Sequence, residues 1–286
     1  MRSENGVFMK VNFSVDSDRC TGCGICNQVC LSSIIYQDPV TKIPVISDDG
    51  SEFCTACGHC ESFCPKGAIR IKSPELALFP DKSSIQKIQP EMVECLIGSR
   101  RTIRTFHKST IPKDHLLKLL EMTRYAPSGF NLHPVEWMIV TDPAFIHTLS
   151  SATISWLHSL QEIGNSDEYA PLLSVIPKIL SVWESGEDPI CYHAPALIIA
   201  HADKTIHSAG YDAIIALSYL DLIAHVYDLG TCWAGLLQMA LSGSADVRKL
   251  LPIPPGHLVH HLLIIGKPLY DVHQIPKRPP VKVSFV

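Results

Sequence analysis

A chain of 286 residues with 46% hydrophobic residues is long enough for two domains and can bury a sizeable core. The formal net charge of −4 argues against a surface that binds nucleic acid or an anionic membrane. No stretch reaches the roughly 18 uninterrupted apolar residues of a membrane helix, and the N-terminus lacks the apolar centre of a secretory signal. We therefore expect a cytoplasmic protein, in which clustered cysteines bind metal more often than they form disulfides.

Most of the cysteines lie in two matched runs near the N-terminus, each with the spacing C-x2-C-x2-C-x3-C. The first run is Cys20, Cys23, Cys26 and Cys30, and the second is Cys54, Cys57, Cys60 and Cys64. A two-residue gap lets the chain wrap one corner of a 4Fe–4S cube. Glycines between the cysteines allow the backbone to approach the sulfurs with a positive φ. The spacing therefore predicts two 4Fe–4S clusters.

The fourth cysteine of each run ligates the other cluster in proteins with this spacing. We therefore assign Cys20, Cys23, Cys26 and Cys64 to one cluster, and Cys54, Cys57, Cys60 and Cys30 to the second. Zinc is the alternative, in a zinc-stabilised binding module, because two C-x2-C pairs suit a zinc ribbon. Zinc takes four ligands per site, however, and has no use for a regular third and fourth cysteine in both runs.

This block resembles the bacterial two-cluster ferredoxins over about residues 11–73, and the fragments VDSDRCTGCGIC and CPKGAIRI carry the resemblance. Leu31 departs from it, because many such proteins have proline after the fourth cysteine. The segment PVTKIPVISDDG predicts a hairpin that turns near Asp48–Gly50. We place a ferredoxin-like domain at residues 1–73 and a linker at residues 74–89, where prolines and serines accumulate.

From residue 90 to residue 286 the pattern changes to helices alternating with a few strands, which predicts an α+β domain built on one sheet. A helix is expected to open at Pro90. A second helix is expected from Thr110, as N-cap, to Arg124, with four leucines inside: Leu116, Leu117, Leu119 and Leu120. The runs VEWMIV, PALIIAHA and HLVHHLLIIG predict strands. A long helix is expected over residues 208–229, ended by Gly230.

The stretch SRRTIRTF, after the first of these helices, holds three arginines and a threonine: Arg100, Arg101, Thr102 and Arg104. These residues alone leave two interpretations open. Cations at a helix end stabilise the last carbonyls and the helix dipole. Alternatively, arginine forks and a threonine hydroxyl bind a phosphate group.

Three further stretches follow, APSGFNLHP (126–134), DLGTCWAG (228–235) and IPKRPP (275–280). Each is weak alone, but all four in this order are similar to the FMN-dependent nitroreductase family over residues 90–286. The resemblance implies a homodimer with two FMN sites at the subunit interface. Arg100, Thr102 and Arg104 match the family's R-x-S-x-R contacts to the phosphate and ribityl groups.

The resemblance also implies roles for the later stretches. Pro127, Ser128, Gly129 and Asn131 match the P-S-S-x-N turn that reaches the flavin of the partner subunit, with Gly129 in place of a serine. His133 stands where glutamine is usual, which leaves that contact open. Ala234 and Gly235 match the segment beside the isoalloxazine ring. Lys277 and Arg278 match the C-terminal basic pair at the phosphate.

Together the two resemblances imply an iron–sulfur flavoprotein oxidoreductase. Electrons would enter through the clusters, collect on FMN and leave to a small acceptor such as a nitroaromatic or a quinone. An external ferredoxin or flavodoxin is the expected donor, with NAD(P)H as the other choice. Reductive dehalogenation or other flavin chemistry is an alternative, and an electron carrier without its own small substrate is another. Substrate choice is expected in residues 162–192, and no catalytic residue is predicted.

Three cysteines and the histidines remain. Cys95, Cys191 and Cys232 lie outside the runs, and Cys232 is expected to be a small buried apolar residue. The 14 histidines show no ligand-like cluster in the sequence. Of His260 and His261, one is expected to face the core and the other the opposite side of a strand.

Overall fold

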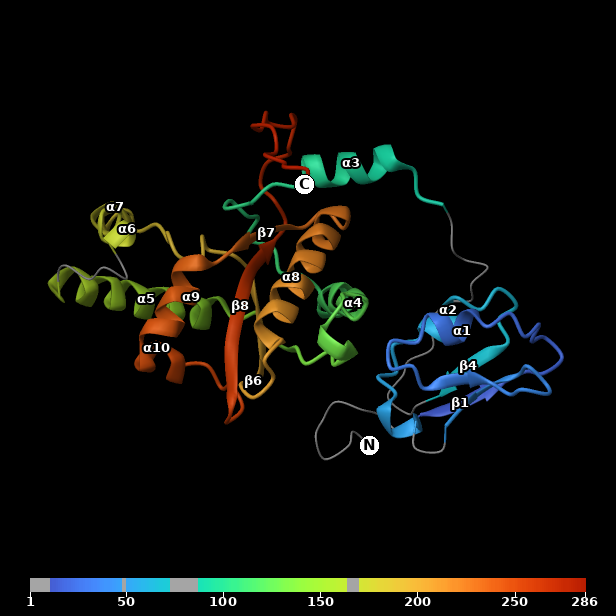
Figure 1. Ribbon diagram of the computed structural model, residues 1–286. Helices are drawn as coiled ribbons and strands as arrows, with labels where there is room; N and C mark the ends of the chain where they lie inside the picture. Colours follow the sequence, from blue (N-terminus) through green and yellow to red (C-terminus); the bar gives the residue numbers. More distant parts are fainter. Residues whose placement is uncertain (1–10, 48–49, 73–86, 164–169) are drawn as a thin grey trace. The chain divides into compact units, whose positions relative to one another are not determined.

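The structure is a computed structural model, in which residues 11–47, 50–72, 87–163 and 170–286 are described (Figure 1). It divides into two compact units. The first comprises Met1–Lys87 with Gly129–Leu132, and the second comprises Ile88–Ser128 with His133–Val286. Most of the predicted linker at residues 74–89 lies outside the described residues.

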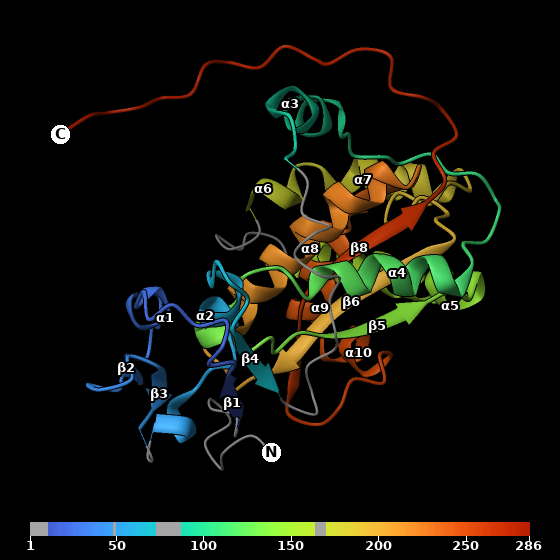
Figure 2. The ribbon, with the colours of Figure 1, turned by 90° about the vertical axis from the view of Figure 1, so that its right-hand side faces the viewer.

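The first unit is built from two strand pairs and short helical turns. β1 (Asn12–Val15) pairs with β4 (Ile69–Lys72), and β2 (Ile35–Gln37) pairs with β3 (Pro44–Ile46), both antiparallel. β1 and β4 lie side by side in Figure 2. The helical turns are α1 (Ile25–Gln28), η1 (Gly50–Phe53) and α2 (His59–Ser62). Each α-turn carries the third cysteine of one run.

The hairpin between the cysteine runs turns earlier than the sequence predicts. Its turn begins at Asp38, whose carboxylate accepts hydrogen bonds from the backbone N–H groups of Val40 at 3.0 Å and Thr41 at 2.7 Å. Aspartate is favoured at the start of a turn for this reason. The predicted turn residues 48 and 49 lie outside the described residues, and Gly50 opens η1.

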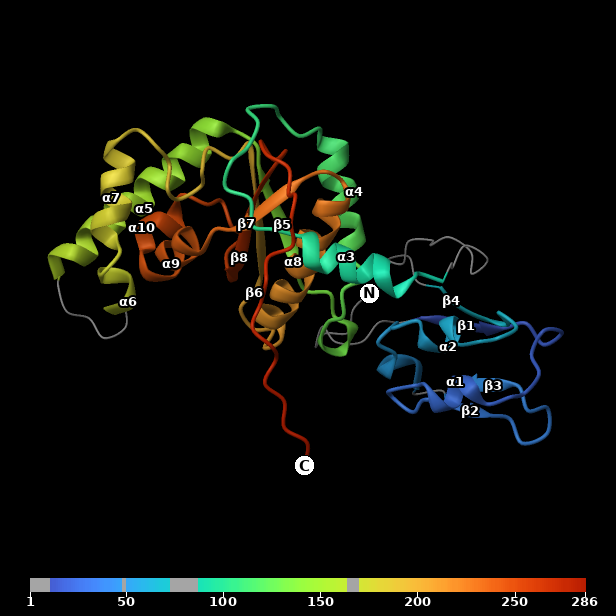
Figure 3. The ribbon, with the colours of Figure 1, turned by 90° about the horizontal axis from the view of Figure 1, so that it is seen from above.

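The second unit is a four-stranded antiparallel sheet between two helical layers, which confirms the α+β class. The strand order is β5 (Glu136–Val140), β6 (Ala196–Asp203), β8 (His257–Gly266) and β7 (Gly230–Trp233). α4 (Lys113–Thr123) and α8 (Ala209–Val226) cover one face, and α5 (Pro143–Ile163), α9 (Gly235–Gly243) and α10 (Ala245–Lys249) cover the other (Figure 3). α6 (Ala170–Leu173) and α7 (Ile176–Glu184) lie beyond α5.

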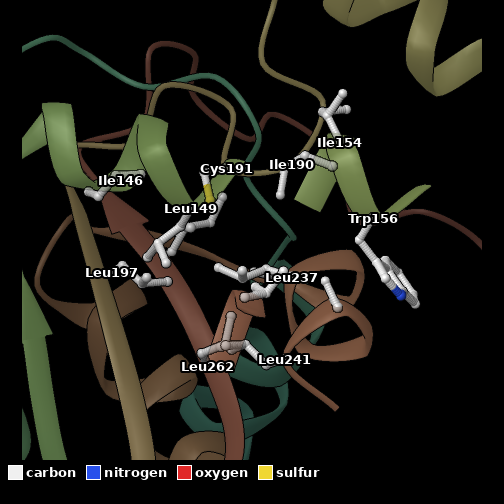
Figure 4. Close-up of a cluster of buried hydrophobic side chains, with 14 of the residues drawn as sticks. Ile146, Leu149, Ile154, Trp156, Ile190, Cys191, Leu197, Leu237, Leu241 and Leu262 are labelled. Carbon is white, nitrogen blue, oxygen red and sulfur yellow. The ribbon is translucent and has the colours of Figure 1, made fainter. Parts of the chain in front are cut away.

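Side-chain alternation along β6 explains how this sheet supports two cores. Leu197 and Ile199 belong to the core under α5 and α9, while Ala196 and Ile198 belong to the core under α4 and α8. Figure 4 shows the first core, where Leu197 lies near Leu237 and Leu262. Every residue of β6 from Ala196 to Ala202 is buried, as expected for a central strand with helices on both faces.

Of three helix predictions, one holds and two differ in detail from the structure. α3 (Pro90–Ser99) opens at Pro90, as predicted. α4 begins after Pro112, so Thr110 is not its N-cap, and Leu117 is 54% exposed rather than inside. α8 ends three residues before the predicted end, and Gly230 opens β7 instead of capping the helix. The reversal of the chain there uses Asp228, at a φ of 56°.

α8 is also long and apolar enough to cross a membrane by length and composition, with a mean hydropathy of 1.2 over its 18 residues. Of that window, 44% is buried within the structure. Leu217 and Leu220 are fully buried against the sheet. A core helix passes the same test, so this feature carries no argument for a membrane.

Candidate cluster and flavin sites

Two cavities in the first unit are each lined by four cysteines. One contains Cys20, Cys23, Cys26 and Cys64, and the other contains Cys30, Cys54, Cys57 and Cys60. The last cysteine of each run therefore lines the cavity of the other run, in agreement with the predicted grouping. The remaining walls are largely apolar, with Ile25 and Ile69 in the first cavity and Ile34 and Ile35 in the second. Four thiols around such a cavity fit the corners of a 4Fe–4S cube.

Matched glycines bring the chain around each cavity. Gly24 and Gly58 precede α1 and α2 with φ values of 75° and 73°, a region that favours glycine. The helical turn that follows each glycine buries the third cysteine, Cys26 or Cys60. The two runs therefore fold alike because their residues impose the same local backbone.

The cavities affect the thiols unequally. Burial raises the pKa of Cys26 and Cys54, and it raises the pKa of Cys60 to about 12. Burial also acts to raise the pKa of Cys64, but backbone N–H donors, led by Ala68 at 3.2 Å from Sγ, outweigh it and leave that pKa below its ordinary value. Iron binds the thiolate, so cluster loading must displace protons from the buried thiols.

The arginine stretch lies beside β7 in the second unit. Thr102 forms a parallel bridge with Thr231, and the Ile103 N–H donates to the Thr231 carbonyl at 2.9 Å. Arg100 Nη1 lies 3.3 Å from the carboxylate of Asp221 on α8. The Thr231 hydroxyl donates to the other oxygen of the same carboxylate. Asp221 thereby fixes the position of Arg100.

The two interpretations of the arginines apply to different residues. Arg101 turns back on α3 and donates from Nε to the Ser99 carbonyl at 3.4 Å and from Nη2 to the Gly98 carbonyl, which is the helix-end role. A cavity of about 490 Å³ opens next to this segment. Its polar lining includes Arg100, Arg101, Asp221, Thr231 and Lys267. Arg100 is therefore the arginine best placed for an anion here.

Arg104 lies near the end of the segment expected to choose the substrate. Its guanidinium carbon is 5.8 Å from the centre of the Tyr192 ring, a cation–π distance. Burial raises the pKa of Tyr192, and the neighbouring Arg104 partly opposes that shift. The backbone before Tyr192 is held by buried Asp188, whose carboxylate accepts from the Ile190 and Cys191 N–H groups at 2.9 Å each.

Ala234 and Gly235 follow β7 directly and form the start of α9. Ala234 is buried, whereas a side chain placed on Gly235 would meet nothing within 4 Å. The structure therefore brings Arg100, Thr102 and these two residues to the same edge strand.

Those turn residues that belong to the second unit lie at the other edge of the sheet. Pro127, Ser128 and His133 line a cavity of about 450 Å³ beside α4 and β5, and the Ser128 hydroxyl accepts from the His133 N–H at 3.0 Å. Gly129 and Asn131 form a turn (η3, Gly129–Asn131) that is grouped with the first unit. Three strand spacings of about 4.8 Å separate β5 from β7.

The C-terminal basic pair lies in the tail that follows β8. Lys277 and Arg278 are exposed in a segment without helix or strand, whose extended course Figure 2 shows. The nearest anchor of this segment is Ile275, which packs beside Gly98 of α3. Within one chain, the predicted flavin residues are thus distributed over β7, the β5 edge and the tail.

Some residues of these sites were missed by sequence reasoning. Asp221 had a usable signal, because a carboxylate within the apolar run ALSYLDLIAHV requires a partner if it is buried. No sequence signal could have identified Tyr192, since its contact with Arg104 joins segments that are distant in the chain. Cys232 is 4% exposed, as expected for a buried apolar residue, and Cys191 is also buried.

The histidines differ from the prediction. Glu136, His201 and His257 offer ligand atoms that all lie within 4.8 Å of one another, so a ligand-like cluster exists that the sequence did not reveal. His260 and His261 are both half-buried. His261 packs edge-on against Trp233, with ring centres 4.6 Å apart.

Comparison with known proteins identifies both units. The sequence model of the 4Fe–4S dicluster domain matches residues 19–69, and that of the nitroreductase family matches residues 97–267. A Thermus thermophilus protein named NADH dehydrogenase is 27% identical over 186 residues, which are 62% of this chain and 88% of that protein. An iodotyrosine deiodinase from Haliscomenobacter hydrossis is 26% identical over 102 residues, 31% of this chain and 46% of that protein.

Solved structures agree on the fold. A nitroreductase with bound FMN from Desulfitobacterium hafniense superimposes with a TM-score of 0.55 at 20% identity, covering 70% of this chain and 100% of that one. Since the nitroreductase model also matches more than half of the sequence, the chain belongs to the nitroreductase family and carries a 4Fe–4S dicluster domain before it.

Proposed function

We propose that this protein is an FMN-dependent oxidoreductase that passes electrons from two 4Fe–4S clusters to the flavin and on to a small acceptor such as a nitroaromatic or a quinone. The observation that carries the proposal is the presence, in one chain, of two four-cysteine cavities and a nitroreductase sheet. Bound FMN supplies the chemistry that joins one-electron donors to two-electron acceptors.

Different residues of the second unit bind different parts of the flavin cofactor. Arg100, positioned by Asp221, and Thr102 bind the phosphate and ribityl end beside β7, and Arg104 completes this group. Ala234 and Gly235 lie along the ring, where the open space at Gly235 admits a flat group. Lys277 or Arg278 adds a charge to the phosphate. The backbone donors near the ring stabilise negative charge on the reduced cofactor.

The site is completed by a second copy of the chain in a homodimer. Within one chain, the β7 edge and the turn with Pro127 and Ser128 lie at opposite edges of the sheet. In a homodimer, one subunit would supply the β7 edge of a flavin site and its partner would supply the turn. α3 supports this assembly, because none of its residues is buried and Met92 and Ile97 are 66% and 58% exposed. Apolar helix surface of this kind is covered in a stable assembly.

The expected electron donor is an external ferredoxin or flavodoxin, with NAD(P)H as the competing choice, and the expected compartment is the cytoplasm.

The experiment that tests the electron relay is done under anaerobic conditions. Reduced ferredoxin or NAD(P)H is mixed with the loaded protein, and flavin bleaching is followed in the wild type and in Cys23→Ser. Cys95→Ser is the matched control, because Cys95 is an exposed cysteine outside both cavities.

We expect ferredoxin to reduce the flavin quickly in the wild type and Cys95→Ser, and slowly in Cys23→Ser. The relay is wrong if NAD(P)H reduces the flavin fast and equally well in the chain that lacks an intact cluster. An acceptor screen on the reduced protein then identifies the acceptor class.

Reductive dehalogenation is the second candidate, and the similarity to an iodotyrosine deiodinase favours it. The similarity spans less than half of that protein. Release of halide from halogenated phenols by the reduced protein would support this candidate, and nitroaromatic or quinone reduction without halide release would exclude it.

A further inference from the structure

Three neighbouring strands bring a glutamate and two histidines together at one end of the sheet. Glu136 on β5 is directly opposite His201 on β6, and His201 is opposite Val259 on β8. His257 lies two residues before Val259. Residues that are opposite in a ladder, or two apart in a strand, share a face of the sheet. All three side chains therefore project from the same face.

A β-bulge makes this possible. Ala200 pairs with His261, but the next residue of β6, His201, pairs with Val259, so His260 is left out of the ladder. With a regular register, His201 would oppose His260, and His257 would project from the opposite face. The extra residue re-aims the start of β8, as bulges do at functional sites.

The ligand atoms are close to the geometry of a metal site. His201 Nδ1 and His257 Nδ1 are 3.1 Å apart. Two imidazole nitrogens bound to one tetrahedral zinc ion, each at about 2.05 Å, are about 3.3 Å apart. The third ligand atom is within 4.8 Å of both. Glu136 is exposed, so rotation of its side chain can bring the carboxylate closer.

The electrostatics favour a cation here. The carboxylate of Glu136 offers an oxygen within 4.8 Å of the ring nitrogens of both histidines, and its negative charge attracts a cation. Two Nδ1 atoms 3.1 Å apart cannot both carry protons, so at least one lone pair already faces the other ring. Asp203, opposite His257 in the ladder, adds a second nearby carboxylate.

We propose that Glu136, His201 and His257 bind one zinc ion, with water as the fourth ligand. Two histidines and a carboxylate with an open position are a known zinc ligand set. On binding, each ring carries its proton on Nε2 and turns Nδ1 to the metal. The ion ties the edge strand β5 to β6 and β8. None of the three residues lines the cluster cavities or is a predicted flavin contact, and Glu136 also lines the cavity that contains Pro127 and Ser128.

The test uses the full chain with its iron–sulfur clusters and flavin loaded, under anaerobic conditions. Equilibrium dialysis against Zn²⁺ is followed by analysis of zinc and iron in each sample. The wild type should bind one zinc per chain without losing iron. His257→Gln and Glu136→Gln should each bind zinc at least about tenfold more weakly. The matched controls His115→Gln and Glu184→Gln replace exposed residues of α4 and α7 and should bind zinc like the wild type.

A second readout, the Tm, compares variants of exposed side chains only. Zinc should raise the Tm of the wild type and of His115→Gln but not that of Glu136→Gln, whose exposed side chain can change without disturbing the fold. The proposal is overturned if the iron-loaded wild type binds no zinc, or if Glu136→Gln and His257→Gln bind it as tightly as the wild type. Zinc uptake matched by iron loss would also overturn it, because the metal would then occupy the cysteines.

Discussion

Different interactions stabilise the fold of each of the two units. In the sheet unit, leucines and isoleucines are fully buried in two cores, such as Leu149 and Leu197 in one and Ile198 in the other. In the N-terminal unit the core cluster is small, and cysteines are among its buried members, including Cys26, Cys54 and Cys60. A small domain buries a small share of its surface. The N-terminal unit must therefore draw much of its stability from whatever its cysteines bind, whereas the sheet unit supplies its own.

Removal of iron should give the largest difference between the units. We expect an iron chelator with a reductant to unfold the N-terminal unit, because metal binding and folding are coupled in such domains. The sheet unit should stay folded. Limited proteolysis with mass analysis of the fragments measures this, since cleavage should appear within residues 11–72 while the later region stays protected. Equal protection of both regions after iron loss would contradict the comparison.

A core truncation should have the reverse effect. Leu116→Ala, at a residue 1% exposed on α4, should lower the free energy of unfolding of the sheet unit by about 2–5 kcal/mol. Leu117→Ala is the matched control, because the neighbouring leucine is exposed and should cost less than about 0.5 kcal/mol. Thermal unfolding measures both, and iron content should not change. Similar losses in the two variants would show that α4 packs differently.

The ion pair beside β7 should have a smaller effect on stability. Asp221→Asn removes the charge that holds Arg100 and should cost about 1–3 kcal/mol, because the carboxylate is largely buried. Flavin retention should also weaken, since Arg100 is no longer fixed. Asp246→Asn is the control, because its pair with Lys249 is exposed. Thermal unfolding and flavin dialysis report the two effects, and unchanged flavin affinity in Asp221→Asn would remove Arg100 from the phosphate site.

The smallest effect concerns one backbone position. Gly58→Ala should destabilise the N-terminal unit by about 1 kcal/mol, because its φ of 73° is unfavourable for alanine although no atom obstructs the new methyl group. The measurement is the rate at which iron–sulfur absorbance is lost. Gly186→Ala introduces the same kind of strain in the sheet unit, at a φ of 91°, and should leave that rate unchanged. Faster loss in both variants would mean that the two units are not independent.

Local chemistry explains what could be predicted from the sequence. The cysteine spacing and the glycines between the cysteines act within a few residues, so the pairing of Cys64 with the first cavity and of Cys30 with the second was accessible without a structure. Strand runs such as ALIIAHA were equally clear, because a strand covered on both faces is apolar throughout. The predicted positions of helix ends were less accurate, as Thr110 and Gly230 show, because several residues that can end or begin a helix lie close together there.

Contacts between distant segments were decided only by the tertiary structure. The pairing of Arg100 with Asp221 joins residues on either side of two strands and several helices, and the stacking of Arg104 on Tyr192 is similar. The cluster of Glu136, His201 and His257 depends on the register of three strands and on one bulge at His260, which decides the face from which His257 at the start of β8 projects. Sequence fixes which residues are present and what their neighbours impose, while strand register fixes which distant side chains meet.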